Sequence, residues 1–491
     1  MAAIILEKFR THNAKEFIAD FSDSSNYIFI GRSYAWSDEN SPPSPANSES
    51  EVIGALSDMI ALKKVTNTDI SHGLVRYNWT NGTVYDEYRD DYSSSNQTPS
   101  GANNFFDGRG YIVTSDYKVY KCLKTNFNSG GVAQGSTTEP TTVSTTIPQE
   151  TGDGYIWKYM YSISAAEVIK FVTNDFIPVK TIGAKTSVAG TGSNGGFGTA
   201  ATNDGSGQWD VENDSVDGAI YRYIVTAAGS GYSNGSSNNF TVDVAVEGDG
   251  SGAVATLTFA SGALSSVTYK DTSSFGSGYK RASFPTLNSS ISGIAAGSGA
   301  SIKAVISPIN GHGSNPVEEL GGNYVIVNSR LEFGETAGGS DFPTDNDFRQ
   351  IGLIKNPVNN VTSNILTDGT ASATRQITLD DASALSVDDI ITSDTTNNAS
   401  TKRARIVSKS GNVLKVHTIA NGGGEYVNFA NSDDVFKNAS GSKLTDVASS
   451  GVSSAHPEMQ PYSGQILYIE NRGAVSRAAD QIEDIKLIIE M

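Results

Sequence analysis

The chain has 491 residues, and its 53 Asp and Glu outnumber its 35 Lys and Arg, which gives a formal net charge of −18. At about 100–200 residues per domain, this length suggests three or four domains with enough chain for buried cores. An acidic chain without a basic block argues against nucleic acid as a partner, because phosphate binding requires clustered Lys and Arg. The single cysteine, Cys122, excludes an intrachain disulfide and a thiolate metal cage.

The sequence predicts no membrane insertion and no signal peptide. No window reaches 18 apolar residues, the length that a membrane-spanning helix requires. The first residues, MAAIILEKFR, have no basic region before their apolar stretch and no cleavage pattern after it.

Residues 1–185 have the pattern of a mixed unit. Helical spacing of apolar residues predicts a short helix over residues 13–22 and a second over 48–63, where Ser48 can cap the helix and Val52, Ile53, Leu56, Met59 and Ile60 form one face. Strand-like runs begin at Tyr27 (YIFIGRSY), Gly110 (GYIVTSDYKVYKCLK) and Tyr155 (YIWKYMYSI). The Gly-, Ser-, Thr- and Pro-rich stretch 129–147 predicts an exposed loop.

A repeat is hidden in the Gly/Ser-rich stretch that follows, residues 187–312. GSGY at 229–232 recurs at 276–279, and GSGA at 250–253 recurs at 297–300, both with an offset of 47 residues. An alternating strand follows each GSGA, with Ala255, Leu257 and Phe259 in one copy and Ile302, Ala304 and Ile306 in the other, all with the same parity. The pattern predicts two copies of a β-unit whose glycines form tight turns, rather than a flexible linker.

The rest of the chain also favours β structure. Strands are predicted in NYVIVNSRLEF and FRQIGLI within 320–357, and in QILYIEN and DIKLIIEM near the C-terminus. Between them, RQITL, DDIIT, RARIVSKS, NVLKVHTI and EYVNFA predict five short strands of a small barrel or sandwich. The predicted fold class is mainly β, with sandwich or barrel units and a few short helices.

Catalytic and cofactor motifs are weak. No Gly-Lys dipeptide exists, so a Walker A loop is excluded, and no histidine begins an HExxH. Ser233 in GYSNG is followed by a polar turn and a strand, whereas a nucleophile elbow requires a helix. Gly190–Gly195 matches GxGxxG without a following helix, so a loop is favoured over a dinucleotide site. We therefore predict a non-enzyme without a cofactor.

Other polar and aromatic features also favour structural roles. The acid pairs Asp90-Asp91, Asp380-Asp381 and Asp388-Asp389 are typical of solvated turns, and Asp249 stands nearly alone where calcium would need several oxygen ligands. Tyr155, Trp157, Tyr159 and Tyr161 alternate along one strand and should share a face; both faces of that strand look covered, which favours packing or an interface over a sugar platform. Cys122 is predicted to be a small core residue.

The order of several segments resembles a known family. The matching segments are KFRT (8–11), IFIGRSYAWSDEN (28–40), SEVIGALSDMIALKKV (50–65), GDGYIWKYMYSI (152–163), TNDFIPV (173–179), DFRQIGLIKNP (347–357), SGQILYIENR (463–472) and DQIEDIKLII (480–489). In this order they resemble the baseplate wedge protein of T-even-type contractile-tail phages, the product of gene eight. The matched regions make up about half of the chain. The resemblance predicts a core wedge domain interrupted by two inserted β domains, with segments at 1–186 (core), 187–319 (inserted, with the repeat), 320–359 (core), 360–459 (inserted) and 460–491 (core).

The resemblance implies a structural protein of the virion, located in the tail baseplate and assembled in the cytoplasm of the host bacterium. Such proteins form homodimers, contact other wedge proteins and take part in the rearrangement of the baseplate on host attachment. The inserted blocks would add contacts to other baseplate or tail-fibre proteins, or bind a surface glycan. The matched segments supply the interface candidates Arg32, Trp36, Arg349, Glu470, Arg472 and Asp480, which could instead brace the fold of the monomer.

Two other functions remain open from the sequence. In a host-surface adhesin, the repeat block would bind polysaccharide and the remainder would serve as scaffold. A glycan-degrading enzyme would need a pair of carboxylates facing each other across a cleft, and the sequence offers no candidate pair.

Overall fold

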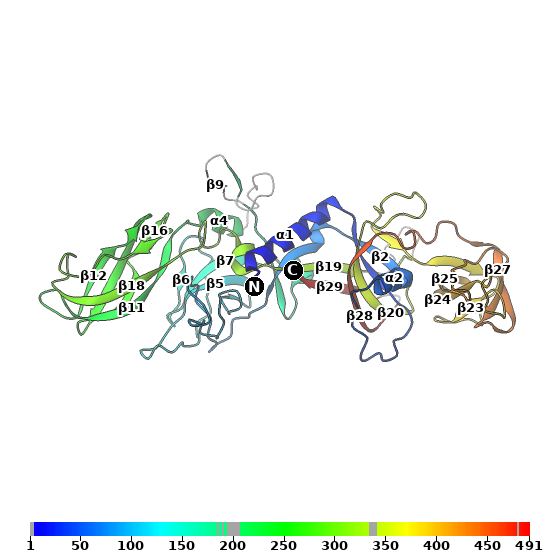
Figure 1. Cartoon of the computed structure of the whole chain (residues 1–491), viewed down its shortest axis with the longest axis horizontal. Coiled ribbons are helices and arrows are strands. Elements are labelled where there is room, and N and C mark those ends of the chain that lie inside the picture. The colour runs from blue at the N-terminus through cyan, green and yellow to red at the C-terminus, as the bar shows by residue number, and fades with distance from the viewer. Residues whose placement is uncertain (1–3, 184–185, 189–190, 194–206, 333–340, 479–480) are drawn as a thin grey trace. The chain divides into compact units, whose positions relative to one another are not determined.

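The structure is a computed structural model that describes residues 4–183, 186–188, 191–193, 207–332, 341–478 and 481–491. Two compact units make up the chain. The first comprises residues 1–15, 71–325 and 489–491, and the second comprises residues 16–70 and 326–488. The prediction of a mainly β fold with few helices is confirmed (Figure 1). The predicted five-segment division into a core and two insertions stays a prediction.

Each helix or strand lies entirely within either the first or the second unit, with four exceptions that contribute residues to both. These are α1 (Glu7–Asp23), β3 (Ile70–Val75), β19 (Tyr324–Leu331) and β29 (Glu483–Glu490). The first unit also contains β4 (Tyr111–Val113), β5 (Lys118–Lys124), β6 (Gln149–Glu150), β7 (Ile156–Ser162), α3 (Ala165–Phe171), β8 (Phe176–Val179), β9 (Thr186–Val188), β10 (Thr191–Ser193), α4 (Gly207–Asp214), β11 (Ile220–Ser233), β12 (Phe240–Ala245), β13 (Glu247–Gly248), β14 (Ser251–Ala260), β15 (Ala263–Tyr269), β16 (Phe275–Ser277), β17 (Ala282–Ser283), β18 (Ala296–Ile306) and α5 (Pro316–Leu320). The second unit also contains β1 (Asn26–Gly31), α2 (Glu49–Asp58), β2 (Met59–Val65), η1 (Asn67–Asp69), β20 (Asn346–Lys355), β21 (Thr370–Ser372), β22 (Arg375–Leu379), β23 (Ile390–Thr392), β24 (Arg403–Ser410), β25 (Val413–Thr418), β26 (Asp434–Lys437), β27 (Ser440–Val452) and β28 (Gln465–Arg477).

One sheet of the first unit, β4-β5-β7-β6, is covered on both faces. The predicted shared face holds for Tyr155, Trp157 and Tyr159, which pack in one cluster, but it is wrong for Tyr161, which packs in the cluster on the other face. The cause is a β-bulge: Val119 pairs with Tyr161 and Tyr120 with Tyr159, so β7 carries one extra residue and its alternation reverses. All four aromatic residues are buried, as the packing interpretation required.

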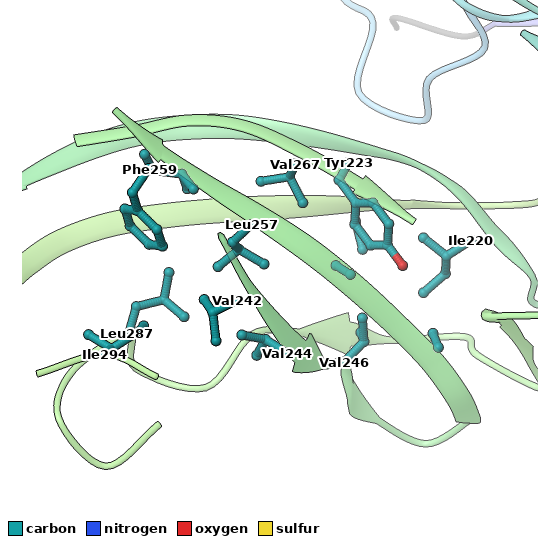
Figure 2. Close-up of a cluster of buried hydrophobic side chains, with 14 of the residues drawn as sticks. Ile220, Tyr223, Val242, Val244, Val246, Leu257, Phe259, Val267, Leu287 and Ile294 are labelled. Atoms are coloured by element: carbon teal, nitrogen blue, oxygen red, sulfur yellow. The ribbon is translucent and has the colours of Figure 1, made fainter. Parts of the chain in front are cut away.

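The two repeat copies form one β-unit with one core. The sheet β12-β14-β15 and the pair β11-β18 enclose buried residues that include Leu257 and Phe259 (Figure 2). Ile302, Ala304 and Ile306 of the second copy pack against this same core, so the predicted parity is confirmed.

The copies pair reciprocally. Ser230 in the first GSGY pairs with Ser298 in the second GSGA, and Ser277 in the second GSGY pairs with Ser251 in the first GSGA. The tyrosine that ends each GSGY is buried against a glycine in the GSGA of the other copy. Tyr232 packs against Gly297, and Tyr279 packs against Gly250. Each copy therefore completes the ladder of the other.

The second unit combines an open sheet, β21-β2-β1-β20-β28, with a closed barrel of β22-β25-β24-β23-β26-β27. The barrel core includes Ile377, Ile391, Ile406 and Leu414. The small-barrel alternative is thus the one that the structure contains. The strand predicted in EYVNFA is wrong, because residues 425–430 lie outside the strands. The short strand β26 (DVFK) and the Ser- and Gly-rich strand β27 complete the barrel instead.

The predicted helix over 48–63 is half correct. Ser48 caps α2, and its hydroxyl accepts a hydrogen bond from the backbone N–H of Glu51. The helix ends at Asp58, and Met59–Val65 forms strand β2 between β1 and β21. Burial on both faces of the sheet overrides the helical spacing in this apolar run.

The close approach of Gly297 to Tyr232 yields a first prediction. A Cβ on Gly297, whose φ is +116°, would lie 2.4 Å from the Tyr232 ring. We expect Gly297→Ala to destabilise the repeat unit by about 1–3 kcal/mol, because the Cβ would also lie 2.6 Å from the Tyr232 Cα, so both the ring and the backbone of Tyr232 have to move. The readout is hydrogen exchange of the β11 and β18 amides. Gly299→Ala is the matched control, since its φ of +81° brings backbone strain but its nearest neighbour lies 3.7 Å away. Equal losses of protection would contradict the role of the ring contact.

Candidate functional site

The interface candidates that the structure describes gather in the second unit around Arg349. The side chain of Arg349, on β20, is 7% exposed and forms ion pairs with Glu39 at 2.7 Å and with Asp347 at 3.0 Å. It also donates a hydrogen bond to the carbonyl oxygen of Ser33. Asp480 lies outside the described residues. Arg349 therefore holds the loop around residues 33–39 onto β20.

Glu39 links three segments. Its carboxylate accepts hydrogen bonds from Arg349 and from the backbone N–H groups of Trp36 (2.8 Å) and Ala474 (3.1 Å). Burial acts to raise the pKa of Glu39, but the hydrogen bonds from Arg349, Trp36 and Ala474 outweigh it and lower the pKa. Glu39 was not among the predicted residues, because a glutamate in a polar loop has no sequence signal. It lies within the matched segment 28–40, which is the one feature that could have pointed to it.

Arg32 and Trp36 form an aromatic–cation stack beside this loop. The Arg32 guanidinium lies 3.5 Å from the Trp36 ring centroid and 3.9 Å from that of Tyr34. The Trp36 indole N–H donates to the carbonyl oxygen of Arg472 at 2.9 Å. Arg32 has a φ of +55°, so its backbone is strained in the orientation that permits the stack.

Glu470 and Arg472 lie on β28 and pair with each other at 3.2 Å. Their side chains are 34% and 43% exposed, respectively. The cluster thus combines contacts that brace the second unit with charged groups that reach solvent. The assignment of these residues to an intermolecular interface stays a prediction.

Sequence reasoning missed a buried charge cluster in the first unit. Lys121 on β5 pairs with Glu319 on α5 at 2.7 Å, and the side chains are 0% and 4% exposed. The His312 ring Nδ1 lies 2.6 Å from the same carboxylate. Lys158, opposite Lys121 in the ladder, donates to the carbonyl oxygen of Thr145. One signal was present: Lys158 interrupts a strand for which the sequence predicted that both faces are covered.

Burial sets the charge states in this cluster. Burial, followed by the charge of Lys121, lowers the pKa of His312 from 6.5 to about 4, so the ring is neutral at pH 7. The contact with Glu319 is therefore a hydrogen bond donated by Nδ1–H. Burial acts to raise the pKa of Glu319, but the charge of Lys121 and the contacts of His312 outweigh it and lower the pKa. Burial also lowers the pKa of Lys158 to about 8.

A pocket of about 510 Å³ lies beside this cluster in the first unit. Lys121 and Glu319 line it, together with aromatic residues that include Tyr88, Phe105 and Phe106. The Lys121 ammonium lies 4.0 Å from the Tyr88 ring centroid. Because the charges are already paired with one another, the arrangement accounts for packing without a bound ligand.

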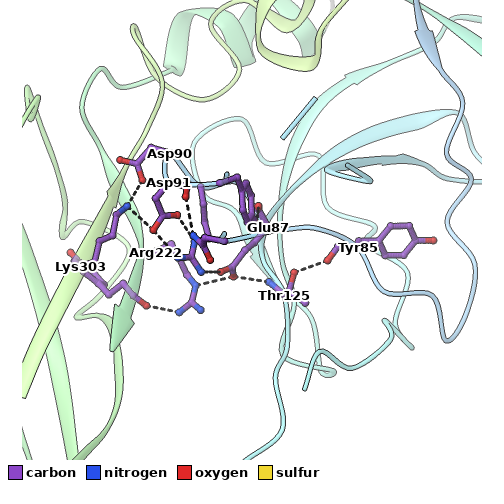
Figure 3. Close-up of polar contacts among 11 residues, drawn as sticks. Tyr85, Glu87, Asp90, Asp91, Thr125, Arg222 and Lys303 are labelled. Atoms are coloured by element: carbon purple, nitrogen blue, oxygen red, sulfur yellow. Dashed lines mark hydrogen bonds and ion pairs between the residues drawn. The ribbon is translucent and has the colours of Figure 1, made fainter. Parts of the chain in front are cut away.

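Ion pairs also hold the repeat unit against the rest of the first unit (Figure 3). Arg222 on β11 pairs with Glu87 at 3.1 Å, and Lys303 on β18 pairs with Asp90 at 2.6 Å and Asp91 at 2.9 Å. Glu87 also accepts the backbone N–H of Thr125. The acid pair Asp90-Asp91 therefore has a structural role as the ion-pair partner of Lys303, which its interpretation as a solvated turn did not anticipate.

The other sequence motifs also have structural surroundings. Asp249 accepts the backbone N–H groups of Lys280 (2.9 Å) and Arg281 (3.0 Å), and Ser233 ends strand β11. Of the segment Gly190–Gly195, residues 191–193 form strand β10, and Gly190, Asn194 and Gly195 lie outside the described residues. Among the residues that the structure describes, no group of three or more His, Cys, Asp or Glu could hold a metal ion, and no helix is long and apolar enough to cross a membrane.

Comparison of the sequence with known proteins tests its resemblance to the phage baseplate wedge family. No family model matches the sequence. Over 210 residues, the chain is 29% identical to the baseplate wedge protein gp8 of Enterobacteria phage T4. The chain resembles a baseplate wedge protein. The match covers 36% of this chain and 60% of the length of gp8, less than two thirds of that protein. The resemblance to the wedge protein that the eight ordered segments indicated is confirmed.

Trp36 provides a test that separates an interface from a brace. If Trp36 lies at an interface, we expect Trp36→Ala to weaken self-association of the full chain by about 30-fold or more, the cost of truncating an interface anchor. Sedimentation velocity over a dilution series would measure this. Trp36→Phe, which keeps a ring for Arg32 to stack on but removes the indole N–H, is the matched control and should retain most of the association. If Trp36→Ala lowers only the melting temperature, Trp36 braces the monomer.

The neutral state of His312 predicts a pH dependence. Because its pKa is lowered on folding, its contribution to stability is complete above pH 6.5 and is lost as the pH falls toward 4. The loss is up to about 3 kcal/mol. We expect His312→Gln to flatten this part of the stability curve, measured by urea unfolding of the full chain between pH 7 and pH 4. His72→Gln is a comparison variant, since burial also lowers the pKa of His72 to about 4 but its ring contacts the carbonyl of Gly322. An unchanged slope for His312→Gln would show that His312 is not kept neutral.

Proposed function

We propose that this chain is a structural component of the baseplate wedge of a contractile-tail phage. It acts through protein–protein interfaces in baseplate assembly and in the rearrangement of the baseplate on host attachment. The observation that carries the proposal is the similarity to the T4 baseplate wedge protein gp8. On this proposal, the chain resides in the tail baseplate of the virion, is assembled in the cytoplasm of the host bacterium, and is not an enzyme.

The proposed partners are a second copy of the chain and other baseplate wedge proteins, with tail-fibre proteins contacting the two predicted inserted blocks. Exposed apolar side chains near the N-terminus support a protein partner. Ile4, Ile5, Leu6 and Phe9 are 83%, 64%, 62% and 54% exposed, respectively. Contiguous exposed apolar residues of this kind are typical of protein interfaces. Permanent assemblies bury about 2,000 Å² or more between partners, so this stretch would be one part of a larger contact.

Immunogold electron microscopy of intact virions tests the proposed location. With antibody raised against the full chain, we expect label on the plate at the end of a contractile tail. The same virions treated with pre-immune antibody are the control. Label along fibres or at their tips would overturn the wedge role and favour the glycan-binding adhesin, in which case glycan-array binding by the full chain is the next measurement.

A further inference from the structure

Arg375 is a half-buried cation that has no partner among the described residues. It begins β22 in the barrel and pairs through its backbone with Val416 on β25. Within the part of the chain that the structure describes, its guanidinium forms no hydrogen bond, ion pair or ring contact. The other arginines of the barrel differ: Arg403 donates to the carbonyl oxygen of Ala420 at 2.7 Å, and Arg405 stacks 4.4 Å from the ring centroid of Tyr34. In a chain where acids outnumber bases by 53 to 35, an unpaired and partly buried guanidinium is unexpected.

The pKa of Arg375 agrees with the absence of a charged neighbour. Burial lowers the pKa of Arg375, and no neighbouring carboxylate opposes the shift. A guanidinium nevertheless stays charged in proteins. Partial burial of such a charge has a free-energy cost that a bound anion would offset.

Arg375 lines a pocket of about 220 Å³ in the second unit. Most of the other lining residues are apolar or aromatic and include Pro457, Met459, Tyr426 and Tyr462. Tyr426 is 55% exposed and Tyr462 is 48% exposed, so both rings are accessible to a ligand. The volume lies below the roughly 300 Å³ at which pockets for drug-sized ligands begin, which suits one amino-acid side chain.

We propose that this pocket binds a carboxylate of an acidic peptide segment from a partner protein, with an adjoining aromatic or aliphatic side chain against Tyr426 and Tyr462. A carboxylate carries a single charge, and one guanidinium can bind its two oxygens in a bidentate pair. A phosphate carries a charge of about −1.5 to −2 and would call for more cations than Arg375 alone. The inference rests on the proposed function only in taking the ligand to be a protein segment.

The apolar part of the walls suits a peptide side chain better than an acidic sugar. A sugar brings hydroxyl groups that lose water on binding and need polar partners. The prolines and Met459 offer none through their side chains, and the Thr418 hydroxyl already donates to Asn428 at 2.7 Å; the polar lining that is left consists of Ser57, His417 and the two tyrosines. An apolar side chain next to the carboxylate could instead pack against the prolines and Met459.

The test uses three small probes and the full chain. N-acetylphenylalanine represents an acidic group beside an aromatic ring, N-acetylphenylalaninamide is its neutral counterpart, and glucuronic acid is a sugar carboxylate. Saturation-transfer NMR titrations give the affinity of each probe. We expect the wild-type chain to bind the acid roughly tenfold more tightly than the amide, the size of a charge-assisted hydrogen bond, and Arg375→Gln to abolish this preference.

Matched variants keep the result interpretable. Arg10→Gln removes an ion-paired arginine in the first unit and should leave the preference unchanged. Arg375→Lys keeps the charge without the bidentate geometry and should retain only part of the preference, which provides a second test if Arg375→Gln fails to fold. Arg375→Met should not lower the melting temperature, because it removes an unpaired, partly buried charge; a clear decrease would indicate a structural role and overturn the site.

Each remaining outcome is also decisive. Equal affinity for the acid and the amide, or a preference that survives Arg375→Gln, would overturn the carboxylate site. Tighter binding of glucuronic acid than of N-acetylphenylalanine would overturn the peptide assignment in favour of an acidic glycan. The location of the chain in virions is measured separately, so label on fibres would overturn the proposed function without changing these affinities.

Discussion

The pairing of buried cations with carboxylates from distant segments is the constraint on which both units depend. Lys121 meets Glu319 and Arg222 meets Glu87 in the first unit, and Arg349 meets Glu39 in the second. A buried cation without its partner costs several kcal/mol, so these pairs restrict which segments can pack together more than they add to net stability. Arg375 differs from these cations, because among the described residues its guanidinium has no partner at all; for the same reason we propose that its partner is external.

Much of the fold was predictable from the sequence, because alternation and turn residues are local signals. The strands at Asn26–Gly31, Ile156–Ser162 and Arg403–Ser410, the Ser48 cap and the shared core of the repeats all follow from such signals. The errors have non-local causes. Met59–Val65 is a strand because sheets bury both of its faces, and the face of Tyr161 is reversed by a bulge that depends on the register with β5.

The candidate sites differ in how far the sequence could reveal them. The resemblance selected Arg32, Trp36 and Arg349, and the structure places them in one cluster. It could not select Glu39, whose role depends on backbone N–H groups from two segments about 440 residues apart in the chain. Arg375 is less predictable still, because the absence of a partner can be recognised only after every neighbour has been placed.

The reciprocal pairing of the repeat copies bears on how this unit arose. Because each GSGY pairs with the GSGA of the other copy, neither copy closes its own ladder. An ancestral chain carrying one copy would have left both motifs unpaired, and two such chains could have satisfied each other through the same contacts about a twofold axis. Duplication of such a unit within one chain would make these intermolecular contacts intramolecular, and it would leave the turns between the halves under less constraint than the interlocked glycines and tyrosines.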